Sequence, residues 1–197
     1  MLPIGAILAA ALVAGCGSSD DKGSAATADD AFVRQMVPHH QMAVEMAKMA
    51  NGQTQHPELK TLVDNITRTQ NAEITQMTSI AGRLDVKPAA MDSPDMNAMG
   101  RDGETLGVPM TKMGMMMDMS TLEGAKPFDR AFIDMMVPHH QGAIRMARGE
   151  LAKGSDGQSR KLATQIIAAQ EKEIGQMNAW RAKWYGEPSP AGGVPTS

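Results

Sequence analysis

The sequence has little of several residue types that would point to a particular fold or function. Its 197 residues include one cysteine, so no disulfide can form within the chain. Aromatic residues make up only 3% of the chain, which argues against a β-sandwich and favours a helical core of small and aliphatic side chains. The net charge is −3 and the basic residues are scattered, so we expect no nucleic-acid partner.

Methionine is the residue in excess, with nineteen copies. Methionine usually fills gaps in a core in small numbers, so this excess needs another explanation. The segment Met36-Val-Pro-His-His-Gln recurs 100 residues later as Met136-Val-Pro-His-His-Gln, and the two segments hold four of the five histidines. The same offset relates Phe32 to Phe132 upstream. A repeat that keeps its histidines and methionines predicts a duplicated metal-binding unit.

The N-terminus indicates a compartment. Residues 2–15 are small and apolar, too few to span a bilayer permanently, and they end at Val13-Ala14-Gly15-Cys16. This resembles a bacterial lipoprotein signal (1–16), which implies lipidation of Cys16 and an extracytoplasmic protein anchored to the cell membrane. A short membrane anchor or a leader cleaved by ordinary signal peptidase are the alternatives. Residues 17–29 then form a flexible tether.

Apolar periodicity predicts an all-α protein with two tandem helical hairpins. The first copy (30–84) contains helices over 30–51 and 57–84, and the second copy (126–186) contains helices over 127–153 and 158–185. Each hairpin has one apolar side to bury, so the two copies should pack face to face as a four-helix bundle.

Three segments are expected to depart from regular helix. Pro38 and Pro138 each remove a backbone donor, and we expect a kink before the histidines rather than a helix that starts there. Residues 85–125 lack sustained periodicity and predict a long, mobile, Met-rich crossover. Residues 187–197 are expected to form a disordered tail.

The repeated histidines and methionines are the candidate metal ligands. On a helix, Met36 neighbours both His39 and His40, and Met46 follows on the same side. Thioether sulfur favours Cu(I), and imidazole also suits copper, so we expect Cu(I), with Ag(I) as a second soft ion. The set comprises Met36, His39, His40, Met46, Met136, His139, His140 and Met146.

Two further groups support this site. Close thioether spacing in the crossover suggests that it also binds Cu(I), through Met110, Met113, Met115, Met116, Met117 and Met119. Inward-facing polar residues of the second and fourth helices are expected to hydrogen-bond the histidines or to serve as ligands themselves: Gln70, Glu73, Gln170 and Glu173.

The paired segments around Met36–Met46 and Asp129–Ala147 resemble the DUF305 family of bacterial exported proteins. The resemblance covers about residues 29–185, and the His-His-Gln motif is specific to the family. It implies a ferritin-like helical bundle, with His39, His40, His139 and His140 as hallmark residues. Some members are implicated in copper binding and tolerance.

The sequence therefore predicts a non-enzymatic, membrane-tethered Cu(I)-binding protein that buffers the ion or passes it to another copper-handling protein. A ferritin-like di-iron oxidase is one alternative, but it needs about four inward carboxylates with Glu-x-x-His pairs, and Gln76 and Gln176 stand where those histidines would be. A structural or partner-binding lipoprotein, with methionines as an adaptable contact surface, is the other.

Overall fold

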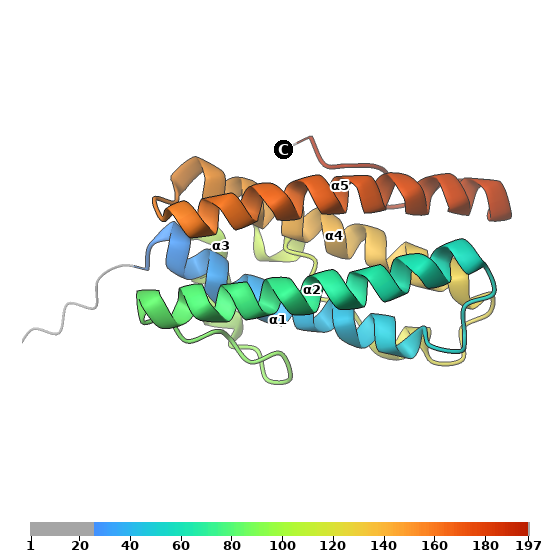
Figure 1. Cartoon of the computed structure of the whole chain (residues 1–197), viewed down its shortest axis with the longest axis horizontal. Coiled ribbons are helices and arrows are strands. Elements are labelled where there is room, and N and C mark those ends of the chain that lie inside the picture. Colours follow the sequence, from blue (N-terminus) through green and yellow to red (C-terminus); the bar gives the residue numbers. More distant parts are fainter. Residues whose placement is uncertain (1–25, 197) are drawn as a thin grey trace, which may run out of the picture.

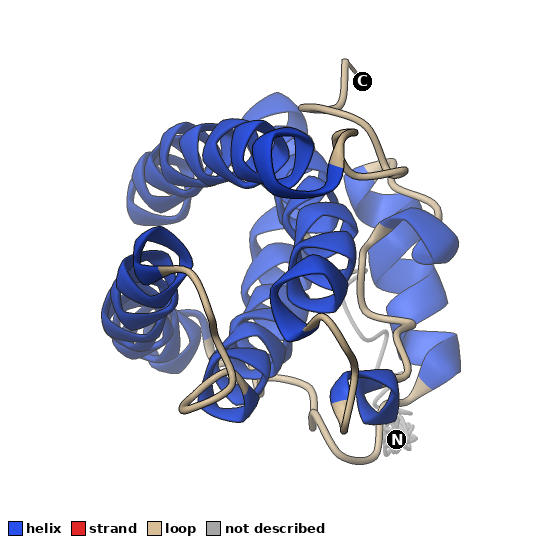
Figure 2. Cartoon of the chain, turned by 90° about the vertical axis from the view of Figure 1, so that its right-hand side faces the viewer, coloured by secondary structure: helices blue, strands red, loops and turns tan. Residues whose placement is uncertain are grey.

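The computed structural model describes residues 26–196, and within them all regular structure is helical. The long helices α1 (Ala28–Met49) and α2 (Pro57–Leu84) form one hairpin, and α4 (Phe128–Lys153) and α5 (Gly157–Tyr185) form the other. Together they make the predicted four-helix bundle, with the short helix α3 (Met96–Leu106) beside it (Figures 1 and 2). The predicted signal, Cys16 and most of the tether lie outside the described residues. None of the helices in the described part could span a membrane.

Local sequence signals place the helix ends within two residues of the predicted boundaries. Thr27 and Asp30 form a capping box at the start of α1, and Pro57 occupies the first turn of α2. The side chain of Asp156 accepts hydrogen bonds from Gln158 and Ser159 at the start of α5, and Gly186 ends that helix in the left-handed conformation.

The two internal prolines lie within continuous helices. Pro38 is inside α1 and Pro138 is inside α4, so neither helix begins at its proline. Pro38 cannot donate to the carbonyl of Arg34, and the backbone N–H of Ala89 donates to that carbonyl instead, at 3.0 Å. The crossover therefore satisfies a backbone group that the proline leaves free.

The structure corrects the expectation of an irregular crossover. Besides α3, residues 85–125 contain two 3-10 turns, η1 (Met110–Lys112) and η2 (Met119–Leu122). The segment also contributes buried apolar side chains to the bundle: Met99, Leu106, Val108, Met113 and Leu122. Sequence periodicity missed α3 because the helix is only 11 residues long and two of these are glycines.

The tail after α5 also differs from the prediction, because residues 187–196 fold back over α4 and α5 (Figure 1). The Gln141 amide donates to the carbonyls of Ala191 and Gly193, and the Arg181 guanidinium donates to those of Glu187 and Pro188. These bonds are long-range side-chain contacts that local composition does not reveal.

The buried methionines divide between two apolar cores that mix the sequence copies. The first core contains Met36 and Met77 of the first copy with Met146 of the second. The second core contains their repeat equivalents, Met136, Met177 and Met46. Each core thus combines side chains from both repeats. Neither hairpin can complete a core alone.

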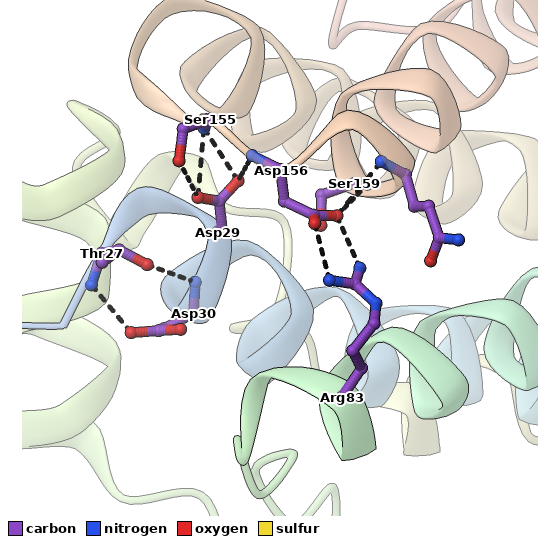
Figure 3. A network of polar contacts seen from close by, with 8 residues as sticks. Thr27, Asp29, Asp30, Arg83, Ser155, Asp156 and Ser159 are labelled. Carbon is purple, nitrogen blue, oxygen red and sulfur yellow. Dashed lines mark hydrogen bonds and ion pairs between the residues drawn. The ribbon is translucent and has the colours of Figure 1, made fainter.

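A buried aspartate at the start of each copy closes the loop of the opposite hairpin. Asp29 accepts the backbone N–H groups of Ser155 and Asp156 (Figure 3). Asp129, at the equivalent position, accepts those of Gln55 and His56. These contacts fix how the two hairpins meet at both ends of the bundle.

Candidate metal centre

The four repeat histidines lie together at the middle of the bundle. α1 carries His39 and His40, α4 carries His139 and His140, and all four are fully buried. The His39 and His139 rings face each other across the helix pair, with centroids 3.7 Å apart and an interplanar angle of 34°. The predicted approach of the two copies across the core is therefore confirmed.

Hydrogen bonds determine which ring nitrogens carry protons. The Nε2 atoms of His40 and His140 lie 2.9 Å and 2.7 Å from carboxylate oxygens of Glu73 and Glu173, to which they donate. His39 Nε2 lies 3.1 Å from the carbonyl oxygen of His139 and donates to it. Because the proton of these three rings is on Nε2, their lone pair for a metal is on Nδ1, whereas neither ring nitrogen of His139 has a hydrogen-bond partner in the described structure.

Buried polar atoms without partners concentrate at this centre. The Nδ1 atoms of all four histidines and Nε2 of His139 have no hydrogen-bond partner in the described structure. Neither do the amide N and O atoms of Gln70 and Gln170, which lie one helical turn before the two glutamates. These are nine of the fourteen such atoms in residues 26–196. Since an unpaired buried polar group is costly, these atoms are available as donors to a bound metal ion.

The two facing histidines are held neutral. Burial lowers the pKa of His39 well below 6.5, and the nearby rings of His40 and His140 lower it further. Burial likewise lowers the pKa of His139, and the other three histidines add to the effect. Neutral imidazole is the form that binds a metal, so protons compete weakly at these two sites.

The predicted methionine ligands lie on either side of the histidines. Met36 and Met146 belong to the first core, and Met46 and Met136 belong to the second. All four are fully buried. The four histidines and these four methionines are therefore all buried within the bundle, and the two inward carboxylates are already bonded to His40 and His140.

The crossover methionines do not share one environment. Met113 is fully buried in the first core, and Met110 and Met115 pack against that core. Met119 packs against the second core. Met117 is partly buried, and Met116 is 56% exposed. Of these six methionines only Met113 is fully buried, and its sulfur lies beside Gly103 of α3.

Among residues 26–196, no group of three or more His, Cys, Asp or Glu side chains is arranged to hold a metal ion. Methionine, which also carries a possible ligand atom, is not one of these four residue types. The donors at the centre are imidazole and thioether groups, and low-coordinate soft ions such as Cu(I) accept them.

Sequence reasoning missed two features of the structure. Asp29 and Asp129 obey the 100-residue offset, so the repeat itself could have drawn attention to them. Gly142 breaks the repeat, because the first copy has Met42 there. A Cβ atom on Gly142 would lie 2.0 Å from the carbonyl oxygen of Met113, so only glycine allows the crossover to pass there.

Similarity to known proteins identifies the family of this chain. The sequence pattern of the family described as "Domain of unknown function (DUF305)" matches residues 29–181 and 152–193. The chain belongs to the DUF305 family.

Two solved structures share its fold. CopM in the Cu(I)-bound form is 36% identical, covers 80% of this chain and 98% of its own, and has a TM-score of 0.65. A predicted secreted DUF305 protein from Streptomyces coelicolor is 28% identical over 84% of this chain and 98% of its own, with a TM-score of 0.70. An uncharacterized protein of Acanthamoeba polyphaga mimivirus is 38% identical over 51 residues, which span 34% of that protein and 26% of this chain.

Proposed function

We propose that this protein binds a soft metal ion, Cu(I) above all and also Ag(I), at the histidine centre, and that it buffers or delivers the ion outside the cytoplasm. The supporting observation is the concentration of unpartnered histidine Nδ1 atoms at the centre of the bundle. All four histidines have no solvent-exposed surface, and two methionine-containing cores share the bundle with them.

The relatives support the same class of ligand. CopM is known in Cu(I)-bound, Cu(II)-bound and Ag-bound forms. It is 35–36% identical to this chain, and the similarity covers 80% of this chain. His39, His40, His139 and His140 would supply nitrogen, and Met36, Met46, Met136 and Met146 would supply sulfur. Glu73 and Glu173 would orient the rings of His40 and His140 without binding the ion themselves.

The predicted leader and the secreted relative from Streptomyces coelicolor support an extracytoplasmic location. We propose lipidation at Cys16, which would hold the bundle near the membrane, where another copper-handling protein could receive the ion. The role is binding rather than catalysis.

The test is an anaerobic Cu(I) titration against a competing chelator. The parent should bind Cu(I) tightly, and a variant with His39, His40, His139 and His140 all replaced by Asn should lose at least one site. A variant with the exposed or half-buried Met115, Met116, Met117 and Met119 replaced by Leu is the matched comparison, because it keeps apolar volume and removes sulfur. Equal copper number and affinity in the histidine variant and the parent would refute the proposed site.

A further inference from the structure

The histidine centre is closed on the side where the crossover passes. All four histidines have no exposed surface, so an ion cannot reach them unless part of the molecule moves. The segment that lies against His139 is the strap, defined here as residues 109–123. A Cβ atom on Gly114 would lie 2.8 Å from the His139 carbonyl oxygen, so the strap backbone directly covers this turn of α4.

The close approach requires glycine on both sides. Gly114 has φ +72, which only glycine adopts without strain, and Gly142 on α4 leaves room for the Met113 carbonyl. The repeat-equivalent position of Gly142 is Met42, a long side chain that would block such an approach. The second copy therefore has a docking position for the strap that the first copy lacks.

The strap is attached to the bundle mainly through apolar side chains. Met113 and Leu122 are its fully buried anchors. Its hydrogen bonds in the described structure are internal, such as Met113 N–H to the Met110 carbonyl and Ser120 N–H to Asp118. The polar exception is the approach of the Met113 backbone to the His39 ring. The four bundle helices, by contrast, are locked at both ends by Asp29 and Asp129.

We propose that the strap is the gate of the histidine centre: it swings away from Gly142 as a unit to admit the ion, which the exposed Met116 and the half-buried Met117 bind first. The identity of the ion rests on the proposed function, whereas the gating geometry does not. Local opening favours segments with few hydrogen bonds to their surroundings, and the strap fits this description. Met116 is 56% exposed and presents a thioether that has no proton to lose.

The test of gating uses no metal. Diethyl pyrocarbonate modifies neutral imidazole, and mass spectrometry locates the modified histidines. In the parent, His39 and His139 should react slowly. Gly142→Ala should push Met113 away and speed their modification at least about tenfold, since opening would cost less free energy. Gly175→Ala is the control, because a Cβ there meets nothing within 4 Å.

A second variant keeps the test decisive if Gly142→Ala does not fold. Met113→Ala removes an anchor of the strap, and Met177→Ala makes a comparable cavity at a residue of α5 in the second core, to which Met113 does not belong. Faster modification in Met113→Ala but not in Met177→Ala supports the gate. Parent-like rates in folded Gly142→Ala and Met113→Ala proteins would overturn it.

Copper uptake then separates the gate from the proposed function. Stopped-flow transfer of Cu(I) from a chelator should be faster in Gly142→Ala. It should be slower when Met116 and Met117 are replaced by Leu, with no change in histidine modification. Faster histidine modification in a protein that binds no Cu(I) would leave the access gate standing and refute both the proposed function and the capture step.

Discussion

At the scale of single residues, the two His–Glu pairs show how the repeat prepares a ligand. His40 donates to Glu73 and His140 donates to Glu173, with nearly equal distances of 2.9 Å and 2.7 Å. The carboxylate holds the ring in one orientation and makes the free nitrogen a better donor to a metal. Each pair joins two helices of one hairpin, so the arrangement exists twice.

We therefore expect Glu73→Gln and Glu173→Gln each to weaken Cu(I) binding by about 10–100-fold, without loss of helical circular dichroism. Glutamine can present an NH2 group to the ring and favour the wrong tautomer. Chelator competition measures the effect. Glu45→Gln is the matched control, because Glu45 pairs with Lys48 on the exposed side of α1. Parent-like affinity in both buried-pair variants would remove these residues from the site.

Glu150 supplies a second prediction at this scale. It is fully buried where the first copy has Ala50, and burial, followed by the nearby Asp29 carboxylate, raises its pKa from 4.5 to about 8. The folded protein therefore keeps a proton that the unfolded chain loses above about pH 4.5. Its stabilising contribution is complete below that pH and disappears as the pH rises through about 8.

Replacement of Glu150 by Gln should raise the unfolding temperature at pH 8 and leave it nearly unchanged at pH 4.5. A series of thermal melts across this range measures the difference between variant and parent, which isolates Glu150 from other titrating groups. A constant difference at every pH would show that Glu150 does not titrate as proposed. Glu150→Ala, the residue of the first copy, is a useful second variant.

At the scale of elements, the hairpin loops depend on the opposite hairpin. Asp29 is 5% exposed and Asp129 is fully buried, and each accepts backbone N–H groups of the other copy's loop. Burial opposes ionisation of Asp29, but hydrogen bonds from Asp156, Glu150 and Ser155 outweigh it and lower its pKa. The loops are thus tertiary structures rather than independent turns.

Replacing Asp129 by Ala should reduce the free energy of unfolding by about 2–4 kcal/mol, since it leaves buried donors unpaired. Asp30→Ala removes only the exposed carboxylate that accepts the Thr27 N–H and should cost about 1 kcal/mol. Urea unfolding compares them. Asp129→Ala should also change tryptophan fluorescence, because the His56 ring that Asp129 holds is stacked on Trp184 at 3.6 Å. Equal losses in the two variants would contradict the interlocked loops.

At the scale of the whole molecule, burying the imidazoles of His39 and His139 makes folding depend on pH. The unfolded chain binds protons at His39 and His139 near pH 6.5, whereas burial lowers their pKa in the folded protein well below that value. The unfolded state therefore gains protons first, and stability falls as the pH drops below about 6.5. Because these pKa values are lowered, protons compete with a bound metal only at a lower pH.

We expect the apo-protein to lose up to about 1.4 kcal/mol per pH unit for each of these two histidines below pH 6.5. Replacement of both His39 and His139 by Asn should flatten this dependence, whatever its effect at pH 8. Urea unfolding at several pH values between about 5 and 8 measures the slope. An unchanged slope in the double variant would assign the acid sensitivity to other groups.

The sequence alone determined the elements and their chemistry. Apolar spacing predicted the four long helices and the face-to-face packing of the two copies, and that packing brings His39 and His139 together across the core. Both inferences rely on local periodicity and on the need of each hairpin to bury its apolar side.

Only the tertiary structure decided what covers the centre. The crossover was expected to be irregular, yet it forms α3 and the strap, because Met99, Met113 and Leu122 find buried positions on the finished bundle. The tail after α5 is held in the same way, by Gln141 and Arg181. Such segments take their order from surfaces that exist only after the helices have packed, and that information is not present in their own composition.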